Sequence, residues 1–213
     1  MENGPIFIGG LDRSGKTLLR RMLSRHPRLS LTRKTYMWSR FYNQYGDLAQ
    51  PENLERCLQA MLQQKTIQAF EPDVDRIRRE FGEGPATYER LFALFHKHNA
   101  ERLGKPRWGD QLKLVERFAE TIFAAYPDAK MIHMVRDPRD RYAAAFADIP
   151  RGKKTKRPDW RAGWSVARWL YSARLAEHNR KSFPERYLVL HYEALMLDPG
   201  KTLRIVCDFL GEA

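Results

Sequence analysis

Short apolar runs alternate with amphipathic segments along this chain, a pattern typical of a sheet covered by helices. Pro5 to Ile8 is an apolar run that predicts a short buried strand, and Gly9 to Gly15 predicts a turn. Lys16 to Arg25 follows with apolar residues at helical spacing, so it predicts a helix. The chain therefore opens with a strand, a loop and a helix.

The next part of the chain predicts a helical insertion. From Tyr36 to about Ala100 the pattern is helical and rich in aromatic residues, with breaks at Pro51, at Pro72 and around Gly82 to Pro85. We expect residues 36–104 to form a cap over one face of the sheet.

The second half predicts two more strands and several helices. The segment Lys105 to Asp110 is expected to end a loop. Met131 to Val135 is apolar except for His133, as in a central parallel strand, and Tyr187 to Leu190 predicts another strand. Helices are predicted at Leu114–Ala125, from Pro138 through Ala147, at Trp160–Arg180 and at Pro199–Leu210. This alternation predicts a three-layer α/β fold with a central parallel sheet, in one domain over residues 1–213.

The loop after the first predicted strand has the Walker A spacing, with Gly10 followed four residues later by Gly15, Lys16 and Thr17. Loops of this kind surround phosphate oxygens with backbone N–H groups and a helix N-terminus, while the lysine adds a positive charge. The alternative is a chance glycine-rich turn. The strand before the loop and the helix after it favour phosphate binding.

Four segments in order resemble sulfotransferases that use 3′-phosphoadenosine 5′-phosphosulfate (PAPS), especially bacterial enzymes and the related tyrosylprotein enzymes. PIFIGGLDRSGKTLLRRMLSRHP resembles the 5′-phosphosulfate loop, and WGDQLKLVERFAETIFAAYPDAKMIHMVRDPRDRYAAAF resembles the segment around the 3′-phosphate strand. The spacing of Trp164 and Trp169 and the segment RYLVLHYEALMLDPGKTLRIVCDFLG fit as well. The resemblance implies a P-loop fold, PAPS as donor, a hydroxyl or amine acceptor, and a 3′,5′-bisphosphate product.

The resemblance also implies which residues hold the donor. Arg13 and Lys16 would stabilise charge as the sulfuryl group departs. Arg136 matches the 3′-phosphate arginine, with a surface cation as its alternative, and Tyr192 would flank adenine, with a core tyrosine as its alternative. The full expected donor-binding set is Arg13, Ser14, Gly15, Lys16, Thr17, Leu18, Arg136, Ala144 and Tyr192.

Two departures from the family pattern affect the donor site. Lys16 stands where a threonine is usual, and its charge is compatible with holding the phosphosulfate. Ala144 stands where a serine is usual, so the 3′-phosphate would depend on Arg136 with Arg141 or Arg151.

Further departures leave the general base unassigned. Lys34 aligns with the acid that serves as base in the tyrosylprotein enzymes, and a lysine removes a proton only when burial lowers its pKa by several units. Gln111 replaces a frequent lysine, with Lys113 as a substitute. Asp110 is the first candidate for a catalytic base and His133 the second, each with a structural role as its alternative.

The acceptor would be chosen by the cap, where the resemblance is weakest. Five aromatic residues there could line an acceptor pocket or form the core of the cap: Tyr36, Trp38, Phe41, Tyr42 and Tyr45. The basic residues from Lys153 to Arg157 are expected to form a solvated loop, with acceptor recruitment as the alternative.

The balance of charged residues limits the classes of partner that this protein is expected to bind. Thirty-eight Lys and Arg residues against 26 Asp and Glu give a formal charge of +12, which favours anionic partners, including an anionic acceptor. No nucleic-acid motif or membrane-length apolar run is present in the sequence, so neither partner is expected. Cys57 and Cys207 are far apart and the histidines lack metal-ligand spacing, so no metal is expected. We expect a cytoplasmic enzyme.

Two other functions remain open. A P-loop kinase using ATP or GTP would fit the GxxxxGKT string, but no later predicted strand ends in an aspartate for magnesium. A degenerate, non-catalytic nucleotide-binding module would fit the changes at Lys34, Gln111 and Ala144.

Overall fold

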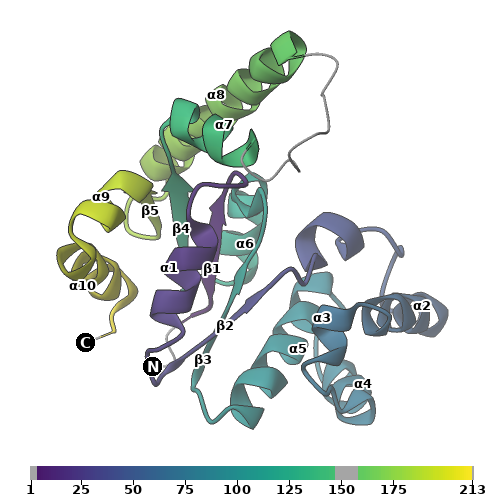
Figure 1. Ribbon diagram of the computed structural model, residues 1–213. Coiled ribbons are helices and arrows are strands. Elements are labelled where there is room, and N and C mark those ends of the chain that lie inside the picture. The colour runs from purple at the N-terminus through teal and green to yellow at the C-terminus, as the bar shows by residue number, and fades with distance from the viewer. Residues whose placement is uncertain (1–3, 147–157, 213) are drawn as a thin grey trace.

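The computed structural model describes residues 4–146 and 158–212 (Figure 1). Its centre is a five-stranded sheet in the order β2-β3-β1-β4-β5, with every neighbouring pair parallel. The strands are β1 (Ile6–Gly10), β2 (Leu29–Arg33), β3 (Arg107–Gln111), β4 (Lys130–Val135) and β5 (Tyr187–His191). The α/β fold with a central parallel sheet is confirmed.

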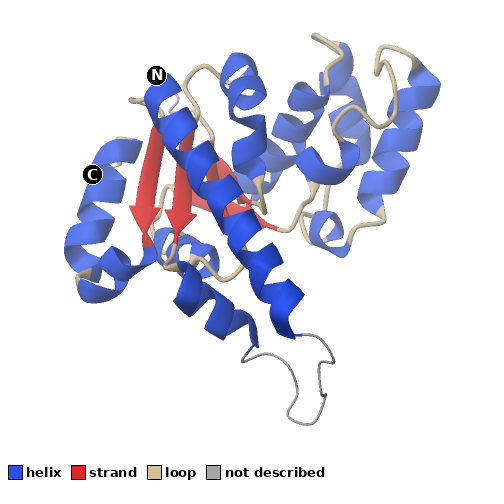
Figure 2. Ribbon diagram, turned by 90° about the horizontal axis from the view of Figure 1, so that it is seen from above, coloured by secondary structure: helices blue, strands red, loops and turns tan. Residues whose placement is uncertain are grey.

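Helices cover both faces of this sheet. One face carries α1 (Lys16–Leu23), α9 (Tyr192–Leu197) and α10 (Pro199–Leu210). The other carries α6 (Ala119–Ala125) and the long α8 (Pro158–Ser182), which crosses the sheet in Figure 2. Helix α7 (Pro138–Phe146) follows β4, and the 3₁₀ turn η2 (Val115–Phe118) precedes α6.

The chain between β2 and β3 is helical and lies beside the sheet (Figure 1). It consists of a π-helical turn, η1 (Met37–Phe41), followed by α2 (Pro51–Leu62), α3 (Lys65–Gln68), α4 (Val74–Gly82) and α5 (Tyr88–Arg102). Its aromatic side chains belong to the larger of two hydrophobic clusters. Trp38 packs edge-on against Phe7 of β1 at 6.3 Å between ring centroids, so the cap and the sheet share one core.

Strand β1 shows why the sheet needs both layers. Phe7 faces the aromatic cluster, while Ile6 and Ile8 face the aliphatic cluster on the side of α1 and α10. All three side chains are at most 1% exposed. Because successive strand residues point to opposite faces, an apolar strand without polar alternation requires cover on both sides.

Two of the five strands were not predicted. The expectation of a loop ending at Asp110 was wrong, because Arg107–Gln111 forms β3 between β2 and β1. This strand is polar in sequence yet fully buried, since neighbouring elements supply partners. Arg107, for example, pairs with Glu212 at 3.0 Å and donates to the Leu210 carbonyl.

The other predicted elements occur with small differences at their ends. The helix expected over Leu114–Ala125 is divided into η2 and α6, whereas α10 has the predicted bounds. Arg151 and the basic segment Lys153 to Arg157 lie outside the described residues. Among the residues that are described, no helix combines the length and apolarity needed to span a bilayer.

Candidate active site

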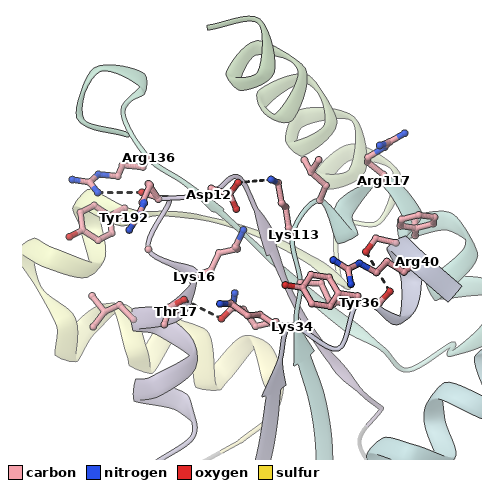
Figure 3. Close-up of a pocket in the computed structure, with 18 residues that line it drawn as sticks. Asp12, Lys16, Thr17, Lys34, Tyr36, Arg40, Lys113, Arg117, Arg136 and Tyr192 are labelled. Carbon is pink, nitrogen blue, oxygen red and sulfur yellow. Dashed lines mark hydrogen bonds and ion pairs between the residues drawn. The ribbon is translucent and has the colours of Figure 1, made fainter. Parts of the chain in front are cut away.

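A cavity of about 980 Å³ opens at the carboxyl end of β1 (Figure 3). The chain leaves β1 toward β2 on one side of the sheet and leaves the neighbouring strand β4 toward β5 on the other side, so the connections diverge between β1 and β4. Parallel α/β sheets bind ligands at such a reversal point. The lining comprises Asp12, Arg13, Gly15, Lys16, Thr17, Leu18, Lys34, Tyr36, Ser39, Arg40, Gln111, Leu112, Lys113, Leu114, Arg117, Phe118, Arg136 and Tyr192.

The phosphate-type loop forms the rim of this cavity and leads into α1. Gly10 and Gly15 have φ angles of 114° and 94°, in the region that favours glycine. A Cβ atom on Gly15 would lie 2.4 Å from Cδ2 of Tyr192, so this position also requires the absence of a side chain. The loop therefore presents the N-terminus of an eight-residue helix to the cavity.

Lys16 is the first residue of α1 and its side chain is 6% exposed. Its Nζ donates hydrogen bonds to the carbonyl oxygens of Gly10 and Leu11, so the ammonium lies across the inside of the loop. Burial lowers the pKa of Lys16 to about 8, with the charges of Glu116 and Asp12 acting in the opposite direction. The side chain therefore remains mostly protonated at neutral pH.

A buried acid supports the loop from below. Glu116 of η2 is 1% exposed, and its Oε2 accepts a hydrogen bond of 2.9 Å from the Gly10 backbone N–H. His133 lies 3.7 Å from Oε1 of the same acid and bonds Tyr187 and Ser172 through its two ring nitrogens. Burial lowers the pKa of His133, so it is neutral in this network. His133, the second candidate base, lies beneath the loop and does not line the cavity.

Arg136 follows β4 and contacts both the loop and α9. Its Nη1 donates to the Arg13 carbonyl oxygen at 3.3 Å, and its Cζ lies 4.3 Å from the centroid of the Tyr192 ring. The indole of Trp169 on α8 donates to the Arg136 carbonyl oxygen at 2.9 Å. Arg136 thereby connects the loop after β1 with α8 and α9. Figure 3 shows Arg136 and Tyr192 together at one end of the cavity.

Asp110, the first candidate base, is placed differently from the expectation. It lies on β3 with 1% exposure and is absent from the cavity lining. Thr32 donates to its Oδ1 at 2.9 Å, and Thr35 donates to its Oδ2. Burial raises its pKa to about 7. The carboxyl group therefore holds β2 and the chain that leaves it, and it does not face the cavity.

That chain forms the wall of the cavity on the cap side. Lys34 and Tyr36 have left-handed φ angles of 55° and 59°, and both line the cavity, while Thr35 between them is fully buried. The Arg40 guanidinium carbon lies 4.1 Å from the centroid of the Tyr36 ring. The wall thus combines one aromatic face with two cations.

Several lining residues were missed from the sequence. Asp12 is the one acid among the described residues of the lining, and its Oδ2 lies 2.6 Å from Lys113 Nζ. Burial alone would raise the pKa of Asp12, but the Lys113 hydrogen bond and the Lys16 charge outweigh it and lower the pKa. One weak signal for this ion pair is present in the sequence, namely opposite charges at Asp12 and Lys113, which follow two neighbouring strands. Gln111 accepts from the Thr17 hydroxyl at 3.3 Å, which a lysine there would not do.

Three of the expected donor-site residues do not line the main cavity. Ser14 is buried in the loop and its hydroxyl has no partner within the described chain. Ala144 lies on α7. Arg141 on the same helix is 6% exposed and donates to the backbone and hydroxyl oxygens of Ser165. Thr17 and Leu18, by contrast, reach the cavity.

The described residues contain no group of three or more His, Cys, Asp or Glu side chains that could hold a metal ion. The cavity instead gathers seven basic side chains, namely Arg13, Lys16, Lys34, Arg40, Lys113, Arg117 and Arg136. Such a surface suits a multiply charged anion.

Comparison with known proteins identifies relatives along the whole chain. A protein-tyrosine sulfotransferase of Drosophila melanogaster is 25% identical over 207 residues, which cover 96% of this chain and 37% of the fly protein. Sulfotransferase 2A2 of Rattus norvegicus is 29% identical over 104 residues, covering 45% of this chain and 35% of the rat protein. This chain therefore spans about a third of the length of these curated relatives.

Solved structures show the same fold. The sulfotransferase domain of the Synechococcus PCC 7002 olefin synthase is 23% identical, with a TM-score of 0.57 and coverage of 98% of this chain and 73% of that one. A sequence profile described as "Sulfotransferase family" matches residues 5–213. The chain belongs to the sulfotransferase family.

Proposed function

We propose that this protein transfers a sulfuryl group from PAPS to a hydroxyl or amine acceptor and releases 3′-phosphoadenosine 5′-phosphate (PAP). The observation that carries the proposal is that Arg13, in the loop after β1, and Arg136, after β4, both line the cavity, with the Arg136 guanidinium bonded to the Arg13 carbonyl oxygen. A donor with phosphate groups at both its 5′ and 3′ ends needs two such positions. The family match over nearly the whole chain supports this assignment.

The chemistry requires charge stabilisation more than proton transfer. The acceptor atom attacks sulfur, the bond from sulfur to the 5′-phosphate oxygen breaks, and PAP leaves with the electron pair while the acceptor loses a proton. In this proposal Arg13 and Lys16 stabilise the leaving oxygen. Lys16 would exchange its bonds to the Gly10 and Leu11 carbonyls for bonds to the donor.

None of the lining residues that the structure describes is suited to serve as a strong general base. Asp12 has a lowered pKa, and Asp110 and His133 are buried outside the cavity. We therefore propose a structural role for Asp110 and His133. Acceptors that react as a phenolate or a neutral amine need no base from the protein.

Binding of PAP and PAPS tests the proposal directly. Isothermal titration should give saturable binding of both, and PAPS with an acceptor panel should yield PAP. Failure of PAP and PAPS to bind at millimolar concentration would refute the function. Stabilisation by magnesium and ATP without PAPS binding would favour a kinase, although β4 and β5 end in Val135 and His191 without an acid for the metal. Binding without turnover would favour a non-catalytic module.

Four expectations stay predictions from the sequence. They are the cytoplasmic location, the particular likeness to bacterial enzymes, the lack of a nucleic-acid partner, and the organisation as one domain with a cap over residues 36–104.

A further inference from the structure

The cavity contains more positive charge than the donor would neutralise. Among the described residues, seven basic side chains line it, and the one acid there, Asp12, is already paired with Lys113. PAPS carries about four negative charges at neutral pH, on its two phosphate groups and its sulfate. The lining therefore keeps an excess of positive charge after the donor binds.

This excess lies at the cap end of the cavity. In Figure 3, Arg136 and Tyr192 lie at one end, and Tyr36 and Arg40 lie at the other. Both Lys34 and Arg40 are exposed to the cavity, and no described carboxylate lies within 4.0 Å of either side chain. These two cations are therefore available to a second ligand.

The backbone that carries these cations is strained and firmly anchored. Lys34 and Tyr36 are non-glycine residues with positive φ, a conformation that persists only where surrounding contacts enforce it. Thr35 between them donates to the buried Asp110 carboxylate, and the Thr66 hydroxyl donates to the Lys34 carbonyl oxygen at 2.9 Å. The wall is therefore a fixed feature of the empty cavity.

Arg40 is also oriented before a ligand binds. Its guanidinium lies over the Tyr36 ring, and Nη1 donates to Oε1 of Gln64 at 3.4 Å. Stacking on an aromatic ring leaves the edge of the guanidinium plane available for a carboxylate or sulfate. Lys34 adds a compact charge on the same wall.

We propose that the acceptor carries an anionic group, a carboxylate or a sulfate, which Lys34 and Arg40 bind beside the Tyr36 ring. This inference rests on the proposed function, because it assigns the loop end of the cavity to PAPS and the cap end to the acceptor. The anionic group binds at the wall and its hydroxyl or amine reaches toward the loop. Neutral acceptors lacking that group leave both cations unpaired.

Two matched phenols test this inference in protein saturated with PAP. Isothermal titration should show 4-hydroxyphenylacetate binding about fivefold or more tightly than 4-hydroxyphenylacetamide, since the two differ in the carboxylate. Lys34→Gln and Arg40→Gln should each remove most of this difference. Arg33→Gln is the matched control, because Arg33 is exposed next to Lys34 but does not line the cavity. It should keep the wild-type preference.

A sulfate-bearing acceptor is tested with 4-hydroxyphenyl sulfate in the same titration, and tighter binding than that of 4-hydroxyphenylacetate would assign the wall to sulfate. Equal affinities of the acetate and the amide, failure of both to bind, or a preference retained in both Lys34→Gln and Arg40→Gln would overturn the inference. PAP affinity is measured on every sample. Its loss in wild-type protein refutes the proposed function, whereas intact PAP affinity with no anion preference refutes only the anionic acceptor.

Discussion

Asp110 should make the stability of this protein fall as the pH rises. Its carboxyl group is buried on β3, and burial raises its pKa from the usual 3.8 to about 7. Each pKa unit corresponds to about 1.4 kcal/mol, so the ionised carboxylate destabilises the folded state by on the order of 4 kcal/mol. The folded protein holds the proton more tightly than the unfolded chain. The stabilisation is therefore present below about pH 4 and is lost as the pH rises through 7.

The substitution Asp110→Asn removes this titration and keeps the side-chain shape. Its amide can still bond the hydroxyl groups of Thr32 and Thr35, which now contact the carboxylate. Neighbouring His96 has its pKa lowered to about 3 by burial, so it is neutral throughout the range and gives no compensating charge. Between pH 4 and pH 8 the free energy of unfolding of the variant should therefore rise relative to wild type by on the order of 4 kcal/mol.

Guanidinium denaturation at several pH values measures this difference, because titrating groups common to both proteins cancel. Asp128→Asn, at an exposed aspartate, is the control and should leave the difference from wild type nearly independent of pH. An Asp110→Asn variant whose stability relative to wild type is the same at pH 4 and pH 8 would refute the reasoning.

Three further substitutions test other parts of the structure. Arg13→Ala should weaken PAP binding at least about tenfold in a calorimetric titration, whereas Lys16→Thr should weaken it less, because a threonine hydroxyl can still donate to the phosphate; the opposite order would favour the kinase alternative. Gly15→Ala should lower the melting temperature and abolish PAP binding, because its Cβ would lie 2.4 Å from Tyr192; normal binding would contradict this. Glu212→Ala should lower the free energy of unfolding by about 3 to 5 kcal/mol in chemical denaturation, since it leaves buried Arg107 without its carboxylate partner. A loss below about 1 kcal/mol, which is typical of an ion pair on the surface, would contradict this prediction.

The elements with strong apolar patterns could be predicted from the sequence. Strands β1, β4 and β5 are apolar runs, and the Walker A spacing located the loop at the end of β1. Strand β3 was missed because its burial depends on partners far away in the chain, such as Glu212 for Arg107. A pattern of apolar residues carries no information about such pairings.

The same limit applies to the site. Asp110 stood out as a carboxylate near the expected loop, but its role depends on the register that pairs it with Thr32 across β2 and β3. The Asp12 to Lys113 ion pair likewise joins the loop after β1 to the end of β3. The spacing within one segment was enough to predict which residues form the loop after β1. The residues of the cap-side wall could be recognised only once the strands were assembled into the sheet, because Asp110 of β3 holds that wall.

The position of β1 in the sheet has a consequence for folding. Ile6 pairs with Gly109 on one side and with Lys130 on the other, so the first strand has no strand neighbour until more than half of the chain is available. Long-range pairing of this kind is slow to form, because the intervening chain must lose much of its conformational freedom first. During synthesis the N-terminal loop is therefore completed only after later segments have formed, and the phosphate binding that we propose for it would arise late, when the two flanking strands dock.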